Sequence, residues 1–334
     1  MPAALPAPSS DASVLSWRDD PLGAGFQQAT LGAATLVRSV ARPPRPRAAF
    51  LHVHGYNDYF FQDHLARAVV DAGYAFYAVD LRHAGRSLRP GTVPHFVTDL
   101  AEYRPDLDAA AETVRRLEPG LPLVVHAHST GGLTVSLWAH DRRADPDRAP
   151  DLLALDSPFL DLSGAWPWRS VSARLVEILG RRRPLAVLST SPSMYATYQL
   201  RSNGGRWSFD TTLKRPEGLP ARAGWLRAVL HGQAAVARGL DIACPVLVAR
   251  SASSGRDSAD NPLLDAQDTI LDVVRIGRRA PLLGERVEQL VVDGGVHDLA
   301  LSADGPRSTY LRGLFHWVDR HLAPTATRPT PETV

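Results

Sequence analysis

Residues 121–132 have the sequence LPLVVHAHSTGG, an apolar run that ends in a serine, a threonine and two glycines. The apolar run predicts a buried strand, and the residues after Ser129 open a helical pattern. A serine at such a sharp strand-to-helix turn is typical of a nucleophile elbow, whose usual sequence is G-x-S-x-G. Gly131 supplies one of the small flanking residues, and Ala127 replaces the other glycine. Ser129 is therefore the candidate nucleophile.

The alternation of strand and helix continues from this stretch in both directions. Apolar runs predict further buried strands at 48–53, 74–79, 152–155, 245–249 and 287–292. Helix-like spacing predicts helices at 61–72, 100–117 and 309–321, and residues 26–40 have the pattern of a hairpin of edge strands. This order predicts an α/β protein with a mostly parallel sheet flanked by helices.

Residues 159–239 interrupt the alternation of strands and helices, because they contain many aromatic residues and no predicted buried strand. They follow the sixth predicted strand, where an insertion would cover the carboxyl ends of the strands, at which open α/β sheets bind ligands. We expect a cap or lid at 159–239 on a core formed by 25–158 and 240–322. Residues 1–24 are expected to form a partly disordered N-terminal segment and 323–334 a C-terminal tail. The aromatic residues of the insertion are Trp166, Trp168, Tyr195, Tyr198, Trp207, Phe209 and Trp225.

The composition is that of an ordinary globular protein, with 44% hydrophobic residues, 22% charged residues and a formal net charge of +2. Lys214 is the only lysine, so arginine carries nearly all of the positive charge, a bias typical of high-GC bacterial genes. The densest basic run, at 181–183, is too short to predict nucleic-acid binding. A single cysteine, Cys244, excludes an intrachain disulfide and lies in an apolar stretch that favours a packing role.

The N-terminus has neither the basic region nor the apolar core of a signal peptide in residues 1–10. No run reaches the roughly 18 apolar residues of a membrane-spanning helix, so we expect no stable membrane insertion. The sequence favours a cytoplasmic protein and leaves its oligomeric state open.

Two further loops complete a candidate active site. Residues 54–58, His-Gly-Tyr-Asn-Asp, follow the first buried strand, where this kind of fold places one half of an oxyanion hole. The backbone amides of Tyr56 and Thr130 are the predicted donors. His297 lies in the Gly-rich loop 294–299 after the last strand, the place of the base in the order Ser, Asp or Glu, His. From such a loop an imidazole can take the proton of Ser129.

The third member of the triad is an aspartate, for which the sequence offers several positions. It should follow the strand at 245–249, and Asp268 is favoured because the apolar residues after it can hold its carboxylate against the sheet. Asp272 is the next choice, and Asp156, after the preceding strand, is a rarer location. The remaining candidates in the same region are Asp257, Asp260 and Asp265.

Four histidines alternate along two predicted neighbouring strands, His52 with His54 and His126 with His128. Alternation places each pair on one sheet face, but a zinc site would need a third ligand and supporting partners. We therefore expect neither a metal nor a cofactor, and interpret His54 and His128 as framing the oxyanion loop and the elbow.

Over residues 25–322 the chain resembles the monoacylglycerol lipase, lysophospholipase and serine aminopeptidase branch of the α/β-hydrolases. The resemblance rests on residues 54–56, the elbow, residues 294–299 and the segment 80–87, Asp-Leu-Arg-His-Ala-Gly-Arg-Ser. That segment matches the D-x-R-G-x-G-x-S element of the branch, with His83 in place of a glycine. The G-x-x-D-x-V-V segment that carries the acid in this branch is matched around Asp268 without its glycine and farther from the strand.

The resemblance implies a serine hydrolase that cleaves an acyl ester through Ser129, His297 and Asp268, with an apolar small molecule as its substrate. A peptidase, thioesterase or lactonase would use the same triad, since the fold does not decide among them. A catalytically silent, ligand-binding homologue is the alternative outside the enzymes.

Overall fold

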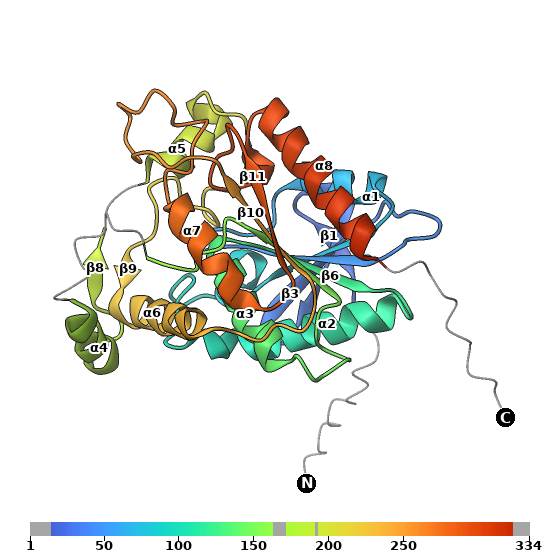
Figure 1. Cartoon of the computed structure of the whole chain (residues 1–334), viewed down its shortest axis with the longest axis horizontal. Coiled ribbons are helices and arrows are strands. Elements are labelled where there is room, and N and C mark those ends of the chain that lie inside the picture. Colours follow the sequence, from blue (N-terminus) through green and yellow to red (C-terminus); the bar gives the residue numbers. More distant parts are fainter. Residues whose placement is uncertain (1–14, 163–171, 191–192, 323–334) are drawn as a thin grey trace, which may run out of the picture.

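The computed structural model describes residues 15–162, 172–190 and 193–322 (Figure 1). The predictions for residues 1–14, for the tail 323–334 and for Trp166 and Trp168 lie outside the described residues.

A nine-stranded sheet forms the centre of the molecule, with the strand order β1-β2-β3-β5-β4-β6-β7-β10-β11. The strands from β5 to β11 in this order pair in parallel, and β1, β2 and β3 extend one edge in antiparallel fashion. Every residue of β4, β5, β6 and β7 is buried, as expected for parallel strands covered on both faces. The predicted mostly parallel α/β sheet is therefore confirmed. The strands are β1 (Arg18–Asp20), β2 (Gly23–Leu31), β3 (Ala34–Ser39), β4 (Ala49–Val53), β5 (Ala75–Asp80), β6 (Leu123–His128), β7 (Leu152–Asp156), β10 (Val246–Ser251) and β11 (Val287–Val292).

Helices cover both faces of this sheet (Figure 1). One apolar cluster joins α1 (Asp63–Asp71) and α8 (Asp304–His321) to side chains such as Phe50 and Leu152. The other joins α2 (Arg104–Leu117), α3 (Ser129–Asp141) and α7 (Val273–Arg279) to the opposite side of the same strands, through side chains such as Leu51 and Leu153. None of the helices that the structure describes combines the length and apolar character needed to cross a membrane.

The structure differs from the predicted elements at three places. The helix predicted over 100–117 is a 3₁₀ turn, η2 (Leu100–Tyr103), followed by α2, because Pro105 is accommodated only in the first turn of an α-helix. The last helix begins at Asp304, ahead of the apolar pattern that suggested 309. An additional strand, β1, lies in the segment 1–24, for which no strand was predicted. Because β1 precedes the hairpin, the sixth strand predicted from the sequence is β7 of the structure.

β1 is held to the core by charge. Asp20 is buried and pairs with Arg86, which also pairs with the buried Asp80 at the end of β5. A guanidinium between two buried carboxylates satisfies all three groups, which would be costly to bury alone. This ion-pair network ties residues ahead of the hairpin to the loop behind β5.

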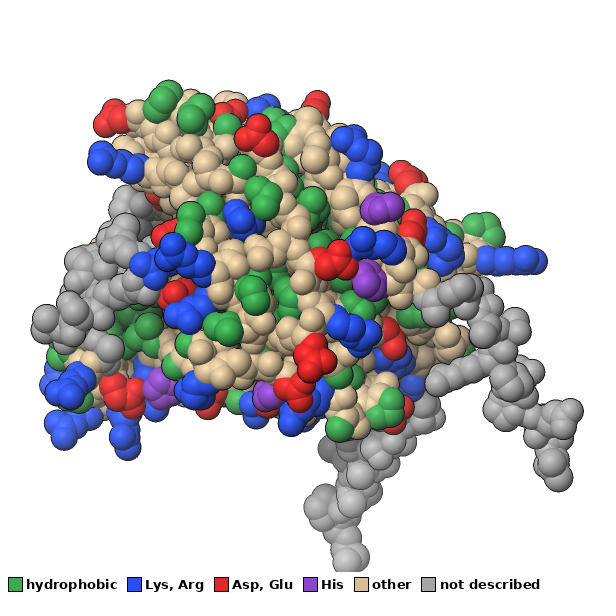
Figure 2. Space-filling view, viewed as in Figure 1, with side chains coloured by type: hydrophobic (Ala, Val, Ile, Leu, Met, Phe, Trp, Pro, Cys, Tyr) green, Lys and Arg blue, Asp and Glu red, His purple; other side chains and the backbone are tan. Residues whose placement is uncertain are grey.

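Residues between β7 and β10 form a separate set of elements on one side of the sheet (Figure 1). The long helix α6 (Ala223–Arg238) packs on α3 through the apolar cluster that contains Trp225, Leu226 and Leu133. The remaining elements are α4 (Ser172–Arg182), β8 (Val187–Ser189), α5 (Met194–Gln199), the 3₁₀ turn η3 (Arg201–Asn203) and β9 (Ala221–Arg222), with β8 and β9 paired antiparallel. On the face shown in Figure 2, basic and acidic side chains are interspersed, in keeping with the near-neutral net charge.

Candidate active site

Ser129 lies at the junction of β6 and α3 in a strained backbone conformation. Its φ is +53°, a region that residues other than glycine rarely adopt. The tight turn brings the start of α3 against the loop after β4: a Cβ on Gly131 would lie 2.2 Å from the carbonyl oxygen of His54. Gly131 is therefore required by sterics, whereas the methyl group of Ala127 is accommodated in the buried core. The predicted strand–turn–helix context of Ser129 is present.

A continuous hydrogen-bond chain joins three side chains from three different loops. Ser129 Oγ lies 2.9 Å from His297 Nε2, and His297 Nδ1 lies 3.0 Å from Asp268 Oδ2. All three residues are buried, and Asp268 is fully shielded from solvent. With Asp268 as a carboxylate, Nδ1 is the donor, so Nε2 is left as the acceptor for the hydroxyl proton of Ser129. The structure thus brings together the three side chains predicted from the sequence.

Asp268 reaches His297 because the chain after β10 makes a long excursion and then returns. The base of this excursion is closed by backbone hydrogen bonds from Asp268 N to Ser253 O and from Gly255 N to Asp268 O. Asp268 Oδ1 accepts hydrogen bonds from the backbone amides of Ile270 and Leu271, which fixes the carboxylate while Oδ2 faces the histidine. The closed base explains how an aspartate far along the chain from β10 comes back to the edge of the sheet.

Of the other candidate aspartates, Asp260 is exposed at the surface, and the remaining four have partners of their own. Asp272 caps α7 by accepting from the amides of Val274 and Arg275. Asp257 accepts from two amides at the start of α5, and Asp265 pairs with Arg206 at the surface. The carboxyl group of Asp156 contacts the Leu299 amide, and burial, reinforced by the nearby charge of Asp298, raises its pKa well above the usual value.

The loop that carries His297 is fastened on both sides. Gly294 adopts a φ of +68° after β11, and Val296 N donates to Ser302 Oγ. Beyond the histidine, Asp298 N donates to the hydroxyl of Tyr195, on α5 of the insertion, and the Tyr195 ring lies edge-on to the imidazole at 5.8 Å between centroids. Tyr195 is thus a neighbour of His297 that no sequence motif identified, since its position depends on how the insertion folds back.

The loop after β4, residues 54–59, is called the oxyanion loop below. A Cβ on Gly55 would lie 3.0 Å from Ser129 Cβ, so this loop lies directly against Ser129. His54 Nε2 accepts from the Leu81 amide, which leaves Nδ1 to donate to Gly55 O at 2.7 Å. Because C=O and N–H point in opposite directions in a trans peptide, holding Gly55 O also fixes the direction of the Tyr56 N–H.

Neither predicted oxyanion donor is engaged elsewhere in the described structure. The Tyr56 amide has no acceptor among residues 15–162, 172–190 and 193–322. The Thr130 amide belongs to the first turn of α3, where N–H groups have no partner within the helix. Both amides are therefore free to bind a negatively charged oxygen next to Ser129.

The segment 80–87 holds the end of the oxyanion loop in place. Asp80 accepts from the amides of Phe60 and Arg86, so it ties the end of the oxyanion loop to β5. His83, the residue that replaces a glycine, has a φ of +64°, which is the conformation that glycine adopts most easily. Gly85 also has positive φ, and a Cβ there would lie 2.3 Å from Asp80 Oδ2.

A group of buried charged side chains surrounds His128, the residue before Ser129. Lys214 Nζ contacts Asp58 Oδ1 at 2.9 Å, and His128 Nδ1 lies 3.5 Å from Asp58 Oδ2. The His128 ring is 4.8 Å from the His297 ring. Burial opposes protonation of His128, but Asp298 and Asp58 outweigh it and raise its pKa to about 9. Lys214 is the only lysine of the sequence, and no local pattern around it predicts a place in the site.

The four alternating histidines do not converge on one point. His52 and His126 face each other across β4 and β6 with their Nδ1 atoms 2.8 Å apart, and burial lowers the pKa of His126 to about 3. His128 instead lies with Asp58 and Asp298, and one ligand atom from each falls within 4.8 Å of the others. Within this trio, Asp58 is also bonded by Lys214, whose ammonium group lies 2.9 Å from Oδ1.

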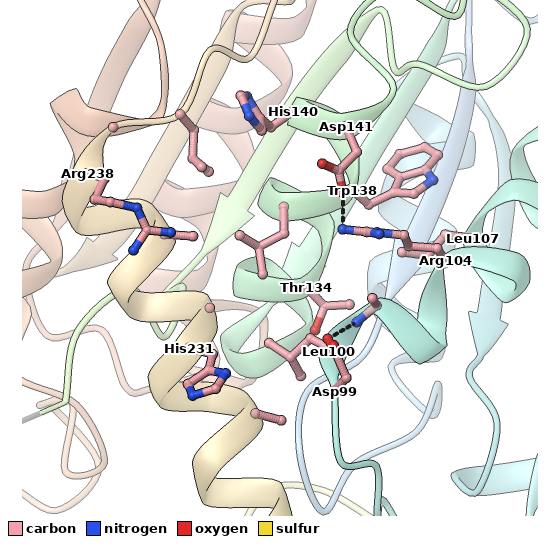
Figure 3. Close-up of a pocket in the computed structure, with 17 residues that line it drawn as sticks. Asp99, Leu100, Arg104, Leu107, Thr134, Trp138, His140, Asp141, His231 and Arg238 are labelled. Atoms are coloured by element: carbon pink, nitrogen blue, oxygen red, sulfur yellow. Dashed lines mark hydrogen bonds and ion pairs between the residues drawn. The ribbon is translucent and has the colours of Figure 1, made fainter. Parts of the chain in front are cut away.

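A separate hollow of about 380 Å³ lies between η2, α2, α3 and α6 (Figure 3). It is lined by Thr134 and Trp138 of α3, by Arg104, which pairs with Asp141, and by His231 of α6. The candidate catalytic residues do not line it, so it is distinct from the site at Ser129.

A family model described as serine aminopeptidase S33 matches residues 44–252 of the chain. Among solved structures, a soluble variant of monoglyceride lipase from Saccharomyces cerevisiae aligns with a TM-score of 0.66 and 16% identity, covering 93% of this chain and 95% of that one. Monoacylglycerol lipase from Paleococcus ferrophilus aligns with a TM-score of 0.61 and 20% identity over 84% and 97%. A carboxyl esterase from Bacillus coagulans aligns with a TM-score of 0.59 and 14% identity over 90% and 99%.

Proposed function

The chain belongs to the serine aminopeptidase S33 family of α/β-hydrolases, and we propose that it is a serine hydrolase that cleaves the ester of an apolar acyl group. The observation that carries this proposal is the buried chain from Ser129 through His297 to Asp268, with its two hydrogen bonds of 2.9 and 3.0 Å. It lies beside two backbone amides that are available to bind an oxyanion.

In the proposed reaction, Ser129 Oγ attacks the ester carbonyl while His297 Nε2 takes the hydroxyl proton. The carbonyl oxygen gains the negative charge, and the amides of Tyr56 and Thr130 donate to it. When the C–O bond to the alcohol breaks, the alcohol leaves with the proton held by His297. A water molecule then attacks the acyl-serine in the same way, His297 takes its proton and returns it to Ser129, and the carboxylic acid is released.

Asp268 has two roles in this scheme. Its hydrogen bond to Nδ1 keeps His297 in the tautomer that accepts at Nε2, and its negative charge stabilises the imidazolium that forms. The bonds from Ile270 and Leu271 hold the carboxylate in place, so little reorganisation is needed during the reaction.

We further propose that residues 159–239 act as a cap over a core formed by 25–158 and 240–322. Tyr195 of this segment contacts the His297 loop, and the ring of Tyr56 in the oxyanion loop lies against that of Trp225, tilted by 33° with 4.1 Å between centroids. Aromatic side chains at this edge favour an acyl group of low polarity, which is the basis for the proposed apolar substrate.

An aminopeptidase is the second candidate, because the description of the family names that activity. Such an enzyme must bind the charged α-amine of its substrate, which calls for an available carboxylate near the nucleophile. The buried carboxylates of Asp58 and Asp298 are already bonded to Lys214 and Gln62, which favours an ester substrate.

The proposal is tested with a fluorophosphonate probe and a panel of substrates. The wild-type chain should be labelled, and Ser129→Ala should lose the label and all turnover. A series of p-nitrophenyl esters of increasing chain length, run beside aminoacyl anilides, separates the two candidates. Failure of the wild-type chain to react with the probe would refute the serine hydrolase proposal. Faster turnover of the anilides than of the esters would favour the aminopeptidase.

A further inference from the structure

We propose that Lys214, from the insertion, is a positioning residue that holds the oxyanion loop in its active geometry through Asp58. This inference rests on the proposed serine hydrolase function. It assigns part of the stabilisation of the transition state in that reaction to residues 210–215, which are called the clamp segment below.

Lys214 is almost completely buried, with 4% of its surface exposed, although lysine is a residue that proteins rarely bury. Its ammonium group bonds Asp58 Oδ1 at 2.9 Å, and Asp58 is 1% exposed. The rings of Phe61 and Phe209 lie 4.8 and 5.5 Å from Nζ, close enough for cation–π attraction and placed so that they exclude water from the pair. The ion pair is therefore a fixed contact rather than a mobile surface one.

Two further contacts join neighbouring residues of the same two segments. Asn57 Nδ2 donates to Arg215 O and Arg215 N donates to Asn57 Oδ1, both at 2.9 Å. Asp210 N donates to the hydroxyl of Tyr59 at 2.8 Å. Three residues of the oxyanion loop are thus bonded to three residues of the clamp segment, and the proposed donor Tyr56 precedes them directly in the chain.

The charge on Asp58 connects the clamp segment with the other half of the oxyanion hole. Burial alone would raise the pKa of Asp58, but the charges of Lys214 and His128 lower it well below the usual value. His128 directly precedes Ser129, and Thr130 follows, so Asp58, in the loop that carries one donor, contacts the residue that opens the turn carrying the other. Without Lys214, Asp58 would be a buried carboxylate with only His128 opposite it, and the loop would be expected to shift towards solvent or towards the elbow.

The test compares wild-type protein with Lys214→Met, which keeps the length of the side chain and removes its charge. We expect kcat for a p-nitrophenyl ester to fall by about 10- to 100-fold, part of the loss seen when an oxyanion donor is removed, with KM within about twofold. The control is Arg206→Met, which breaks an exposed ion pair between the insertion and Asp265 and should leave kcat unchanged.

A second readout reports the oxyanion hole itself. An alkyl trifluoromethyl ketone labelled with ¹³C at the carbonyl adds to the active-site serine, and its chemical shift follows ionisation of the hemiketal hydroxyl. Displacement of the Tyr56 amide should raise the pKa of that hemiketal by about 1 to 2 in Lys214→Met, because each unit corresponds to a tenfold loss of anion stabilisation. A role limited to general stability would leave it unchanged in the folded protein.

Where Lys214→Met does not fold, the double variant Asp58→Asn/Lys214→Met removes the unpaired buried charge and serves in its place. It should fold and show the same loss of kcat and the same rise of the hemiketal pKa. Wild-type values of both quantities in either folded variant would overturn the role of Lys214. Failure of the wild-type chain to react with a fluorophosphonate would instead overturn the proposed function, before any variant is compared.

Discussion

The replacement Asp268→Asn tests how the structure sets the tautomer of His297. In the wild-type chain, Oδ1 accepts from the amides of Ile270 and Leu271 while Oδ2 faces His297 Nδ1. An asparagine can keep both backbone bonds only if its oxygen takes the place of Oδ1. Its NH₂ group then points at Nδ1 and acts as a donor there. The histidine must respond by carrying its proton on Nε2, where it can no longer accept from Ser129.

The size of the effect follows from the cost of the alternative orientation. Turning the asparagine over would place its NH₂ group against two backbone N–H donors and lose two buried hydrogen bonds, at a cost of about 2 kcal/mol or more. Because Asp268 is fully buried, water cannot replace those bonds. We therefore expect the wrong tautomer to dominate and kcat to fall by about 10⁴-fold, as for the same change in a Ser-His-Asp protease. That loss corresponds to about 5 kcal/mol of transition-state stabilisation.

The assay is turnover of a p-nitrophenyl ester by Asp268→Asn and by Asp272→Asn, with thermal unfolding of each variant as a check on folding. Asp272→Asn should retain nearly full activity, because Asp272 caps α7 and pairs with Arg275 and has no contact with His297 among the described residues. Activity of Asp268→Asn within tenfold of wild type would refute the reasoning on the tautomer. If Asp272→Asn lost activity in the same experiment, the catalytic acid would be Asp272.

Three other changes test the packing and the buried charges around the candidate triad. Gly131→Ala should lower kcat and the melting temperature together, because the added methyl group would lie 2.2 Å from the His54 carbonyl oxygen; unchanged values in both assays would contradict this steric account. The folded protein raises the pKa of His128 to about 9, from about 6.5 in the unfolded chain. Protonation of His128 therefore adds up to about 3 kcal/mol to the free energy of unfolding. This contribution is complete below pH 6.5 and is lost as the pH rises through 9. Denaturant titrations at pH 6 to 10 should show this decline, and His128→Gln should flatten it. Arg86→Met leaves two buried carboxylates without their shared cation and should cost about 3–5 kcal/mol of unfolding free energy, measured by urea denaturation; a loss below about 1 kcal/mol would show that the network is not stabilising.

The local sequence was sufficient to predict the place of a residue in the fold where that place depends only on the adjacent strand and turn. Ser129 could be identified because the elbow requires an apolar strand before it and small residues beside it, all within residues 121–132. His297 follows the last strand in the same way. The register of parallel strands then places these loop residues at one edge of the sheet, so their proximity follows from the fold class.

Residues whose positions depend on long-range contacts could not be found in this way. Asp268 was favoured for the apolar residues after it, but the backbone pairing with Ser253 and Gly255 that returns it to the sheet has no local signature. Tyr195 and Lys214 belong to an insertion whose path over the core is not encoded in any periodicity. The only usable signal for Lys214 was its rarity, as one lysine in an arginine-rich chain.

The contacts of the insertion also bear on how the site would open to substrate. Tyr195 bonds the His297 loop, and the clamp segment bonds the oxyanion loop, so the insertion contacts both sides of the candidate site. A lid that lifted as one body would break the buried ion pair of Lys214 and Asp58 and leave the Asp58 carboxylate without its ammonium partner, which is unfavourable by several kcal/mol. Substrate entry that keeps this pair intact is therefore favoured, with any movement confined to parts of the insertion outside the clamp segment and Tyr195. On this view the insertion holds both the loop of Tyr56 and the loop of His297, which is a role beyond that of the cap proposed above.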